Sequence, residues 1–399
     1  MKRKFISKIS MLFLLLVALL TIKSSAFAYT PQSLYDEVWK LVYSKYVDQE
    51  NNGQDWKKWR HKYDDKITTE ADAYVAIDTM LSSLNDPYTR FLPPDEFAEE
   101  GSAISGTLKG IGVQISVKDG KLLVIAPIED TPAAQAGLQA NDHIVEIDGK
   151  STKGMTVKDA ADNIRGEEGT YVKLLVRRGN TEKIYSIPRA EIKIKAITTN
   201  PPEKFALNAN VGYIRLSTFM NKGTSSEFAA ALEKLSDKSG YIIDLRSNPG
   251  GLLSNAIFIS DMLLNGGTIV STVDRDGYKE DTRAAKRIVT NKPIVVLINA
   301  GSASASEILS GALKDNGRAT LVGEKTFGKG LVQEINKLSG GSGLNITTQK
   351  YLTPNGTDIN KKGITPDYVV KFTEEDFKAG KDPQLHKAQM VLLEKISRQ

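Results

Sequence analysis

The sequence contains no cysteine and only three histidines among its 399 residues. Without thiols, the chain can form no disulfide, use no thiolate nucleophile and carry no cysteine-linked lipid anchor. The three histidines, His61, His143 and His386, lie in no setting typical of a catalytic nucleophile or its partner. The chain must therefore be stabilised by its packed cores, and the setting of the histidines favours a base of another type for any nucleophilic hydroxyl.

Acidic residues are missing from the first 28 residues, which hold five of the 53 basic residues. The rest of the chain carries 48 residues of each sign, so the basic pI gives no support for nucleic-acid binding. The segment starts with Met1-Lys2-Arg3-Lys4, continues with an apolar run from Met11 to Ile22, and ends in Ala26-Phe27-Ala28. This pattern predicts a secretory signal peptide over residues 1–28, cleaved after Ala28. The apolar run is shorter than the roughly 20 residues that span a bilayer, so an uncleaved membrane anchor is the lesser alternative.

Patterns for metals and nucleotides are missing as well. There is no HExxH and no cluster of ligating side chains. Residues Gly323–Lys329 match most of a phosphate-binding P-loop, but Gly330 stands where a serine or threonine must hold Mg²⁺. The sequence therefore predicts no metal and no other cofactor.

Residues 29–95, which follow the predicted signal peptide, are predicted to be helical. Hydrophobic residues make up 40% of the sequence, enough for two or three packed domains. Within residues 29–95, apolar residues recur at helical spacing, and a helix is predicted over Glu70–Leu84. Thr69 is its expected N-cap, with Asp72 at the capping-box position. We expect a small N-terminal helical domain over residues 29–95.

The periodicity changes after this domain. Residues 96–190 show short alternating strands interrupted by short helices such as Val157–Ile164. Residues 191–399 show unbroken apolar strands, Tyr241–Leu245 and Ile294–Ile298 among them, alternating with amphipathic helices. That alternation is typical of a sheet covered on both faces. The expected fold class is multidomain α+β, with a helical domain, a β-rich domain and a mixed α/β core.

Ser304 is a candidate nucleophile. A buried strand and a turn lead into a helix predicted over Ser302–Leu313, so Ser304 lies near a helix N-terminus, where free N–H groups favour developing negative charge. With Glu307 three residues later, Ser304 also fits a capping box. Spacing leaves these two roles open, and it leaves Ser302 and Ser306 as alternative nucleophiles.

Lys329 is a candidate general base, in a Gly-Lys-Gly segment after a strand predicted at Ala319–Gly323. Lysine has an ordinary pKa of ~10.4, so this role requires burial to lower the pKa by about three units. Gln333, four residues on, reaches Lys329 only if the residues between them form a helical turn. The alternative for Lys329 is a solvated surface residue.

Backbone N–H groups complete the predicted site. Ala305 follows the candidate nucleophile, and Gly250 and Gly251 end the segment Asp244–Gly251. Glycine lets a backbone turn its N–H toward a ligand because no Cβ stands in the way. Ala305 and one of the two glycines are therefore candidate oxyanion donors.

The β-rich domain carries a candidate binding loop. Gly110, Ile111, Gly112 and Val113 lead into a strand, and such a loop can aim amides at a carboxylate while the strand edge adds an extended peptide. A plain turn between strands is the alternative. Arg165, after the second helix of this domain, is a candidate contact with the α/β core that gates the site. It can equally be a solvated arginine at a helix end.

In this order along the chain, the motifs resemble those of the C-terminal processing proteases, also called tail-specific proteases, over essentially all of residues 30–370. Residues 96–190 resemble a PDZ domain. The helical domain and Asn85–Leu92 are most similar to the photosynthetic-lineage branch, which trims a photosystem II precursor, and related bacterial branches share that segment. The other matching segments are Gly212–Ile214, Asp244–Gly251, Ser302–Glu307, Lys329 with Gln333, Tyr351–Gly356 and Gly363–Asp367.

The resemblance implies roles for these residues. Ser304 becomes the nucleophile, Lys329 the general base, Gln333 its orienting partner, and Gly250 and Ala305 the oxyanion donors. The PDZ-like loop becomes the binding site for protein substrates with apolar, unstructured C-terminal tails. The expected protein is an exported serine endopeptidase, located in a periplasm, a thylakoid lumen or the cell exterior, with residues 191–399 as its protease core.

Two other functions remain as alternatives. An exported, non-enzymatic PDZ-type adaptor would bind tails without cutting them. A hydrolase based on His143 or His386 is placed less well, because these residues fall in a strand of the β-rich domain and in a C-terminal helix. Oligomeric state and peripheral association with a membrane stay open on the sequence.

Overall fold

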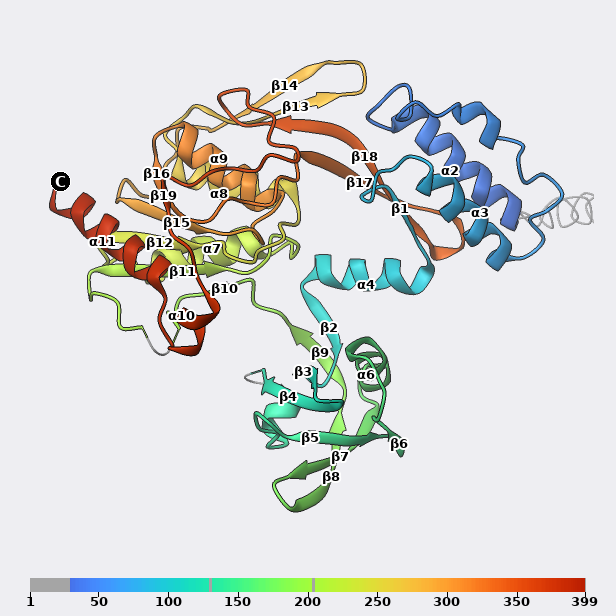
Figure 1. Cartoon of the computed structure of the whole chain (residues 1–399), viewed down its shortest axis with the longest axis horizontal. Helices are drawn as coiled ribbons and strands as arrows, with labels where there is room; N and C mark the ends of the chain where they lie inside the picture. The colour runs from blue at the N-terminus through green and yellow to red at the C-terminus, as the bar shows by residue number, and fades with distance from the viewer. Residues whose placement is uncertain (1–28, 129–130, 203–204, 399) are drawn as a thin grey trace, which may run out of the picture. The chain divides into compact units, whose positions relative to one another are not determined.

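The computed structural model describes residues 29–128, 131–202 and 205–398 (Figure 1). The predicted signal peptide, residues 1–28, lies outside these ranges. The chain forms two compact units, one with the N-terminal helices and Ile335–Ile346, the other with the β-rich module and the α/β core. The predicted multidomain α+β class is confirmed. No helix within the described ranges is both long and apolar enough to cross a bilayer.

The first unit is built on two capped helices, α2 (Pro31–Lys45) and α3 (Glu70–Ser82). Thr69 accepts the N–H of Asp72, and the Asp72 carboxylate accepts the N–H of Thr69, so the predicted capping box is confirmed. A 3-10 turn, η1 (Trp56–Trp59), lies between the helices in the chain. Their apolar faces bury Leu34, Tyr35, Val38, Val42, Ala73, Ile77 and Met80.

A short strand completes this unit. β1 (Arg90–Leu92) pairs antiparallel with the first residues of β18 (Gly343–Leu352), so that Arg90 faces Asn345. The N-terminal unit therefore takes part of its sheet from the C-terminal third of the chain, a pairing that alternation within residues 29–95 cannot reveal.

The β-rich module follows helix α4 (Pro94–Ser105). Alternating apolar residues of its strands point to one buried core, with Ile144, Ile147, Val172 and Leu174 at most 1% exposed. Val157–Ile164 is helical as predicted. The module has the main sheet β3 (Val113–Lys118), β4 (Lys121–Pro127), β5 (His143–Ile147), β7 (Tyr171–Arg178) and β8 (Thr181–Pro188), with β6 (Lys150–Ser151) beside β5, the pair β2 (Thr107–Gly110) and β9 (Ala190–Lys193), and helices α5 (Pro132–Gln135) and α6 (Val157–Ile164).

A mostly parallel sheet organises the α/β core. Its strands run in the order β10-β11-β12-β15-β16-β19, and only the β10 edge is antiparallel. The central strand β15 matches its prediction at Ile294–Ile298, and all five of its residues are buried. The other strands are β10 (Ile197–Thr198), β11 (Val211–Leu216), β12 (Gly240–Asp244), β16 (Ala319–Gly323) and β19 (Tyr368–Val369).

Helices cover both faces of this sheet (Figure 1). Val296 and Ile298 pack in one hydrophobic cluster with residues of α7 (Thr224–Lys234), α8 (Leu253–Leu263) and α9 (Ala305–Asp315). Val295 and Leu297, which point the other way, pack in a second cluster with α11 (Pro383–Ser397). Alternate residues of one strand thus enter two cores, which explains why the strand reads as a continuous apolar run.

A second sheet contains β13 (Thr268–Asp274), β14 (Lys279–Arg283), β17 (Leu331–Lys337) and β18. β13 pairs antiparallel with β14 and with the end of β18. β17 also pairs with β18. This sheet positions Tyr351, whose hydroxyl donates to the Ser304 carbonyl at 3.2 Å. A short helix, α10 (Glu374–Lys378), precedes α11.

Candidate active site

The candidate nucleophile lies on the turn between β15 and α9. The helix begins at Ala305, three residues later than the start predicted at Ser302. Ser304, just before it, has φ 54° and ψ −114°. A non-glycine residue in this region is strained by about 1–3 kcal/mol, and such strain gathers at functional sites. A strained strand-to-helix turn is also how α/β-hydrolases expose their nucleophilic serine.

The neighbouring serines have internal partners. The Ser302 hydroxyl donates to the Leu245 carbonyl at 2.8 Å, and the Ser306 hydroxyl donates to the Asn248 carbonyl at 2.9 Å. Both side chains are completely buried, whereas Ser304 is partly exposed. Of the three serines that the sequence offers, Ser304 is the one that reaches solvent.

Helix capping does not account for the backbone of Ser304. Three other capping boxes, at Thr30, Thr69 and Thr156, have extended N-cap residues with φ of −107°, −125° and −75°. Extended backbone is the usual N-cap conformation. Ser304 departs from it, although the Glu307 carboxylate accepts its N–H at 2.9 Å. The conformation therefore supports a role for Ser304 beyond capping.

The glycine loop after β12 lies against this turn. A Cβ placed on Gly250 would lie 2.7 Å from the Ala303 oxygen, 2.9 Å from the Ala305 nitrogen and 2.9 Å from the Ser304 Cβ. Gly250 has φ 98°, which glycine adopts without strain. The structure thus brings together Gly250, Ser304 and Ala305, three residues that the sequence assigned to one site.

The two glycines differ in their hydrogen bonds. The Gly250 N–H donates to Asn248 Oδ1 at 2.9 Å, so it is already engaged. The hydrogen bonds among the described residues leave the N–H groups of Gly251 and Ala305 without an acceptor. In this arrangement Gly251 is the glycine whose N–H is available as an oxyanion donor. Gly250, which has no Cβ, lets the glycine loop pack closely against the nucleophile turn.

Lys329 lies in the loop between β16 and β17 and is half-buried. Its N–H donates to Glu307 Oε2 at 2.9 Å, the same oxygen that accepts the N–H of Ser304. The two candidate catalytic residues, far apart in sequence, therefore meet through one carboxylate. Sequence reasoning assigned Glu307 only a capping role and missed this link.

Gln333 does not have the setting that its predicted role requires. It lies on strand β17, and its amide nitrogen donates to Thr347 Oγ1 at 3.2 Å. No helical turn joins it to Lys329, because Gly330 is irregular and the strand begins at Leu331. The role of Gln333 stays a prediction from the resemblance.

A buried ion network, which sequence reasoning missed, supports the glycine loop. Arg246 lies 2.7 Å from Asp244 and 2.8 Å from Asp382, the N-cap of α11, and Tyr213 donates to Asp244 at 2.8 Å. Burial alone would raise the pKa of Asp244, but the hydrogen bonds and charge of Arg246 outweigh it and hold the pKa below its usual value. The sequence signal that could have revealed this network is the pair Asp244 and Arg246 at the end of an apolar strand.

The candidate binding loop keeps its glycine for a steric reason. Gly112 has φ 76°, and a Cβ there would lie 2.4 Å from Thr131. The carbonyls of Ile111 and Gly112 accept the N–H groups of Ala133 and Ile128 at 2.8 and 2.9 Å, which holds the loop between β2 and β3. Gly110 and Val113 are the strand ends on either side of it.

Arg165 lies beside this loop but has a different partner from the one expected. Its guanidinium pairs with Glu99 of α4 at 2.7 Å, and its Cγ would lie 4.0 Å from a Cβ on Gly110. Among the described residues, the hydrogen bonds and ion pairs of Arg165 reach Glu99 of helix α4 and Asp162, and none reaches residues 191–399. The gating role of Arg165 stays a prediction.

Comparison with known proteins identifies the family. The model of Peptidase family S41 matches residues 210–370, and the model of the PDZ domain matches residues 123–178. A carboxyl-terminal-processing protease of Synechocystis sp. is 42% identical over 355 residues, which cover 87% of this chain and 83% of that protein. The chain belongs to the carboxyl-terminal-processing proteases. It is therefore a C-terminal processing peptidase, and its β-rich module contains a PDZ domain, as predicted.

Other members of this family are similar to the chain. A carboxy-terminal-processing protease of Bartonella bacilliformis is 42% identical over 307 residues, covering 74% of this chain and 69% of that protein. The solved structure of a photosystem II D1 C-terminal processing protease is 36% identical, with a TM-score of 0.58 and coverage of 86% and 94%. Because the Bartonella protein and the Synechocystis protein are both 42% identical to the chain, identity does not assign the chain to the photosynthetic branch.

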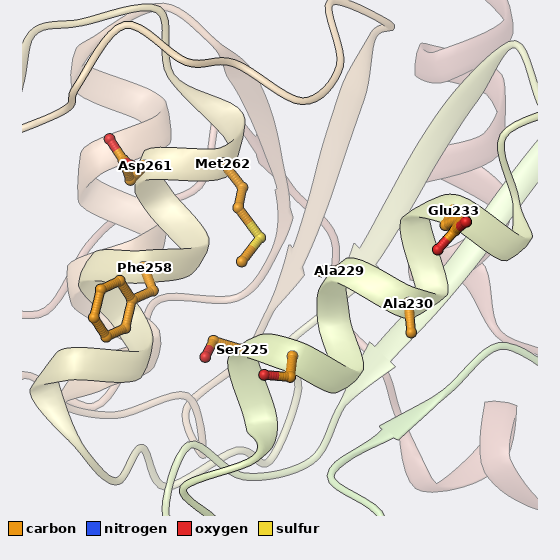
Figure 2. Close-up of a pocket in the computed structure, with 8 residues that line it drawn as sticks. Ser225, Ala229, Ala230, Glu233, Phe258, Asp261 and Met262 are labelled. Carbon is orange, nitrogen blue, oxygen red and sulfur yellow. The ribbon is translucent and has the colours of Figure 1, made fainter.

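A shallow groove of about 590 Å³ lies between α7 and α8, away from the candidate catalytic residues in the sequence. Its lining includes Phe258, Asp261 and Met262 and contains no candidate catalytic residue (Figure 2). Across residues 29–128, 131–202 and 205–398, no group of three or more acidic or histidine side chains could hold a metal ion.

Proposed function

We propose that this peptidase is an exported serine endopeptidase that binds the C-terminal tail of a protein substrate at its PDZ domain and cleaves near that tail. Ser304 is the nucleophile and Lys329 the general base. The observation that carries the proposal is the strained backbone of Ser304 at the start of α9, with Gly250 packed against it. Helix capping alone does not require this strained backbone, because the N-cap residues Thr30, Thr69 and Thr156 cap their helices from an extended conformation.

The chemistry runs through the chain's own groups. The neutral Lys329 amine takes the Ser304 proton as the hydroxyl oxygen attacks the scissile carbonyl carbon. The carbonyl oxygen gains negative charge, and the N–H groups of Ala305 and one glycine of the Gly250–Gly251 pair stabilise it. The protonated lysine then gives its proton to the leaving amine. Water hydrolyses the acyl-enzyme and restores the Ser304 hydroxyl.

Substrate selection rests on the PDZ domain. The loop from Gly110 to Val113 binds the terminal carboxylate, and the edge of β3 adds the preceding residues as an extended strand. Tails that are apolar and unstructured meet both needs, because they lose no folded contacts when they bind. Arg165, which pairs with Glu99 beside this loop, is the candidate for signalling tail occupancy. The basic, apolar leader supports export to an extracytoplasmic compartment.

Amidation of the substrate's C-terminus tests tail recognition. We expect kcat/KM to fall at least about tenfold when a substrate with an unstructured apolar tail is amidated, because the amide removes the charge that the loop's N–H groups bind. The measurement is the initial cleavage rate of the full chain on matched free and amidated substrates. A substrate with an unrelated charged tail is the control, and amidation should change its slow cleavage little. Equal rates on the two apolar tails would contradict the proposal.

A further inference from the structure

The carboxylate of Glu307 joins the nucleophile turn to the lysine loop. Its Oε2 accepts the N–H groups of Ser304 and Lys329, both at 2.9 Å. Its Oε1 accepts the Thr326 hydroxyl at 2.6 Å and the Gly328 N–H at 2.7 Å. The Glu307 side chain is completely buried, although its residue type is almost never buried without partners.

The four contacts match what a carboxylate can accept. Two oxygens offer about four lone-pair sites, and all four partners are donors. One donor belongs to the nucleophile, and the other three belong to the lysine loop. A glutamine at this position would turn an N–H₂ group toward at least one main-chain N–H, so the amide cannot replace the carboxylate without moving a segment.

Other acidic residues in capping boxes of this chain bond only locally. Asp72 accepts from Thr68 and Thr69 at the start of α3, and Asp159 accepts from Thr156 at the start of α6. Both bonding groups are exposed. Glu307 differs because three of its four bonds reach a loop about twenty residues away in the chain. Capping of α9 requires none of these three.

The lysine loop is also held on its other side. The Thr326 hydroxyl accepts the Ile364 N–H at 2.6 Å. Gly328 has φ 90°, and a Cβ there would lie 2.8 Å from the Gly363 nitrogen. On the nucleophile side, the Tyr351 hydroxyl donates to the Ser304 carbonyl at 3.2 Å. The carboxylate thus lies between two segments that are each fixed to further structure.

We propose that Glu307 is a positioning residue that sets the spacing between Ser304 and Lys329. It acts through the backbones of these residues and contacts neither the substrate nor the reacting atoms. This inference rests on the proposed Ser304–Lys329 chemistry. A proton transfer between two side chains depends steeply on their separation, and a misplacement of about 1 Å can lower the rate about 10²-fold.

The test compares Glu307→Gln and Glu307→Ala with Asp315→Asn, measuring kcat, KM and the midpoint of thermal unfolding for the full chain. Asp315 is a matched control, because it lies at the far end of the same helix and its carboxylate also accepts a threonine hydroxyl, of Thr353, and a backbone N–H, of Asn355. We expect kcat to fall at least about tenfold in Glu307→Gln and at least about 100-fold in Glu307→Ala, with KM within about twofold of wild type. Asp315→Asn should keep the wild-type kcat even where its unfolding midpoint falls.

Thr326 provides variants that leave Glu307 in place. Thr326→Val removes one donor from the carboxylate and is expected to lower kcat about threefold or more, whereas Thr326→Ser keeps the hydroxyl and should restore it. These variants carry the test if Glu307→Ala does not fold. Wild-type kcat in Glu307→Gln and Thr326→Val would overturn the inference. So would a kcat that falls in proportion to the unfolding midpoint in Glu307→Gln and Asp315→Asn alike. Ser304→Ala separates the two claims, because activity in that variant contradicts the proposed function itself.

Discussion

Lys329→Ala is expected to lower kcat by about 10⁴-fold or more, because it removes the group that takes the proton from the Ser304 hydroxyl. At neutral pH a serine without a base is a weak nucleophile. The three histidines lie elsewhere in the fold, His61 at the surface beside Asp64, His143 on strand β5 of the β-rich module and His386 on helix α11.

Lys329→Arg separates a base from a fixed positive charge. Arginine keeps the charge, but its pKa above about 12 prevents it from accepting a proton at neutral pH. We expect it to be as inactive as Lys329→Ala. The measurement is single-turnover cleavage of an unstructured, apolar-tailed substrate, with tail binding and thermal unfolding followed in parallel to confirm a folded chain. Substantial cleavage by Lys329→Arg would show that the charge of Lys329, and not its basicity, supports the reaction.

Gly250→Ala is expected to lower kcat about 10²-fold or more, because the added Cβ displaces the nucleophile turn and a misplacement of about 1 Å can lower the rate by that much. The added Cβ would meet the Ala303 oxygen at 2.7 Å and the Ser304 Cβ at 2.9 Å. The nearest atoms to this Cβ are backbone atoms and the Ser304 Cβ, and none is the end of a flexible side chain, so one backbone must shift. The positive φ of 98° adds a further cost of about 1–3 kcal/mol.

Gly317→Ala is the matched control for this change. Gly317 follows α9, has φ 66°, and has nothing within 4 Å of an added Cβ. The alanine there incurs the backbone strain without a collision, so kcat should stay at the wild-type value while the unfolding midpoint falls. Comparable losses of kcat in Gly250→Ala and Gly317→Ala would mean that general destabilisation, and not displacement of the nucleophile turn, explains the first.

Local patterns were enough to predict the regular elements. The strands at Ile294–Ile298 and Ala319–Gly323 and the helix at Val157–Ile164 have the predicted bounds. Each is delimited by a cap, a glycine or a polar residue next to a periodic apolar run, so the local signal and the tertiary environment agree.

Features that depend on distant segments were not predictable in this way. Helix α4 (Pro94–Ser105) has no buried residue, and the prolines at its start indicated a domain boundary instead of a helix. The inclusion of Ile335–Ile346 in the N-terminal unit depends on pairing between β1 and β18, which no local pattern encodes. The role of Gln333 was assigned from the resemblance, and the helical turn that spacing required for direct contact with Lys329 is a strand in the structure.

The candidate site was predicted residue by residue, but not its geometry. Spacing could not choose between Ser302, Ser304 and Ser306, whereas burial and hydrogen bonds single out Ser304. The left-handed backbone of Ser304 is invisible in sequence, because such strain is imposed by surrounding structure. Glu307 looked like an ordinary capping residue, since the three donors from the lysine loop lie far along the chain.

The most direct test of the central claim is intact-mass analysis of an unstructured substrate ending in small apolar residues, incubated with the full chain or with Ser304→Ala. We expect a shortened substrate with the wild-type chain and an unchanged substrate mass with Ser304→Ala, while both proteins bind the tail equally. The same shortened product from Ser304→Ala would contradict the assignment of Ser304 as nucleophile. Binding without cleavage by the wild-type chain would instead favour a peptide-binding adaptor.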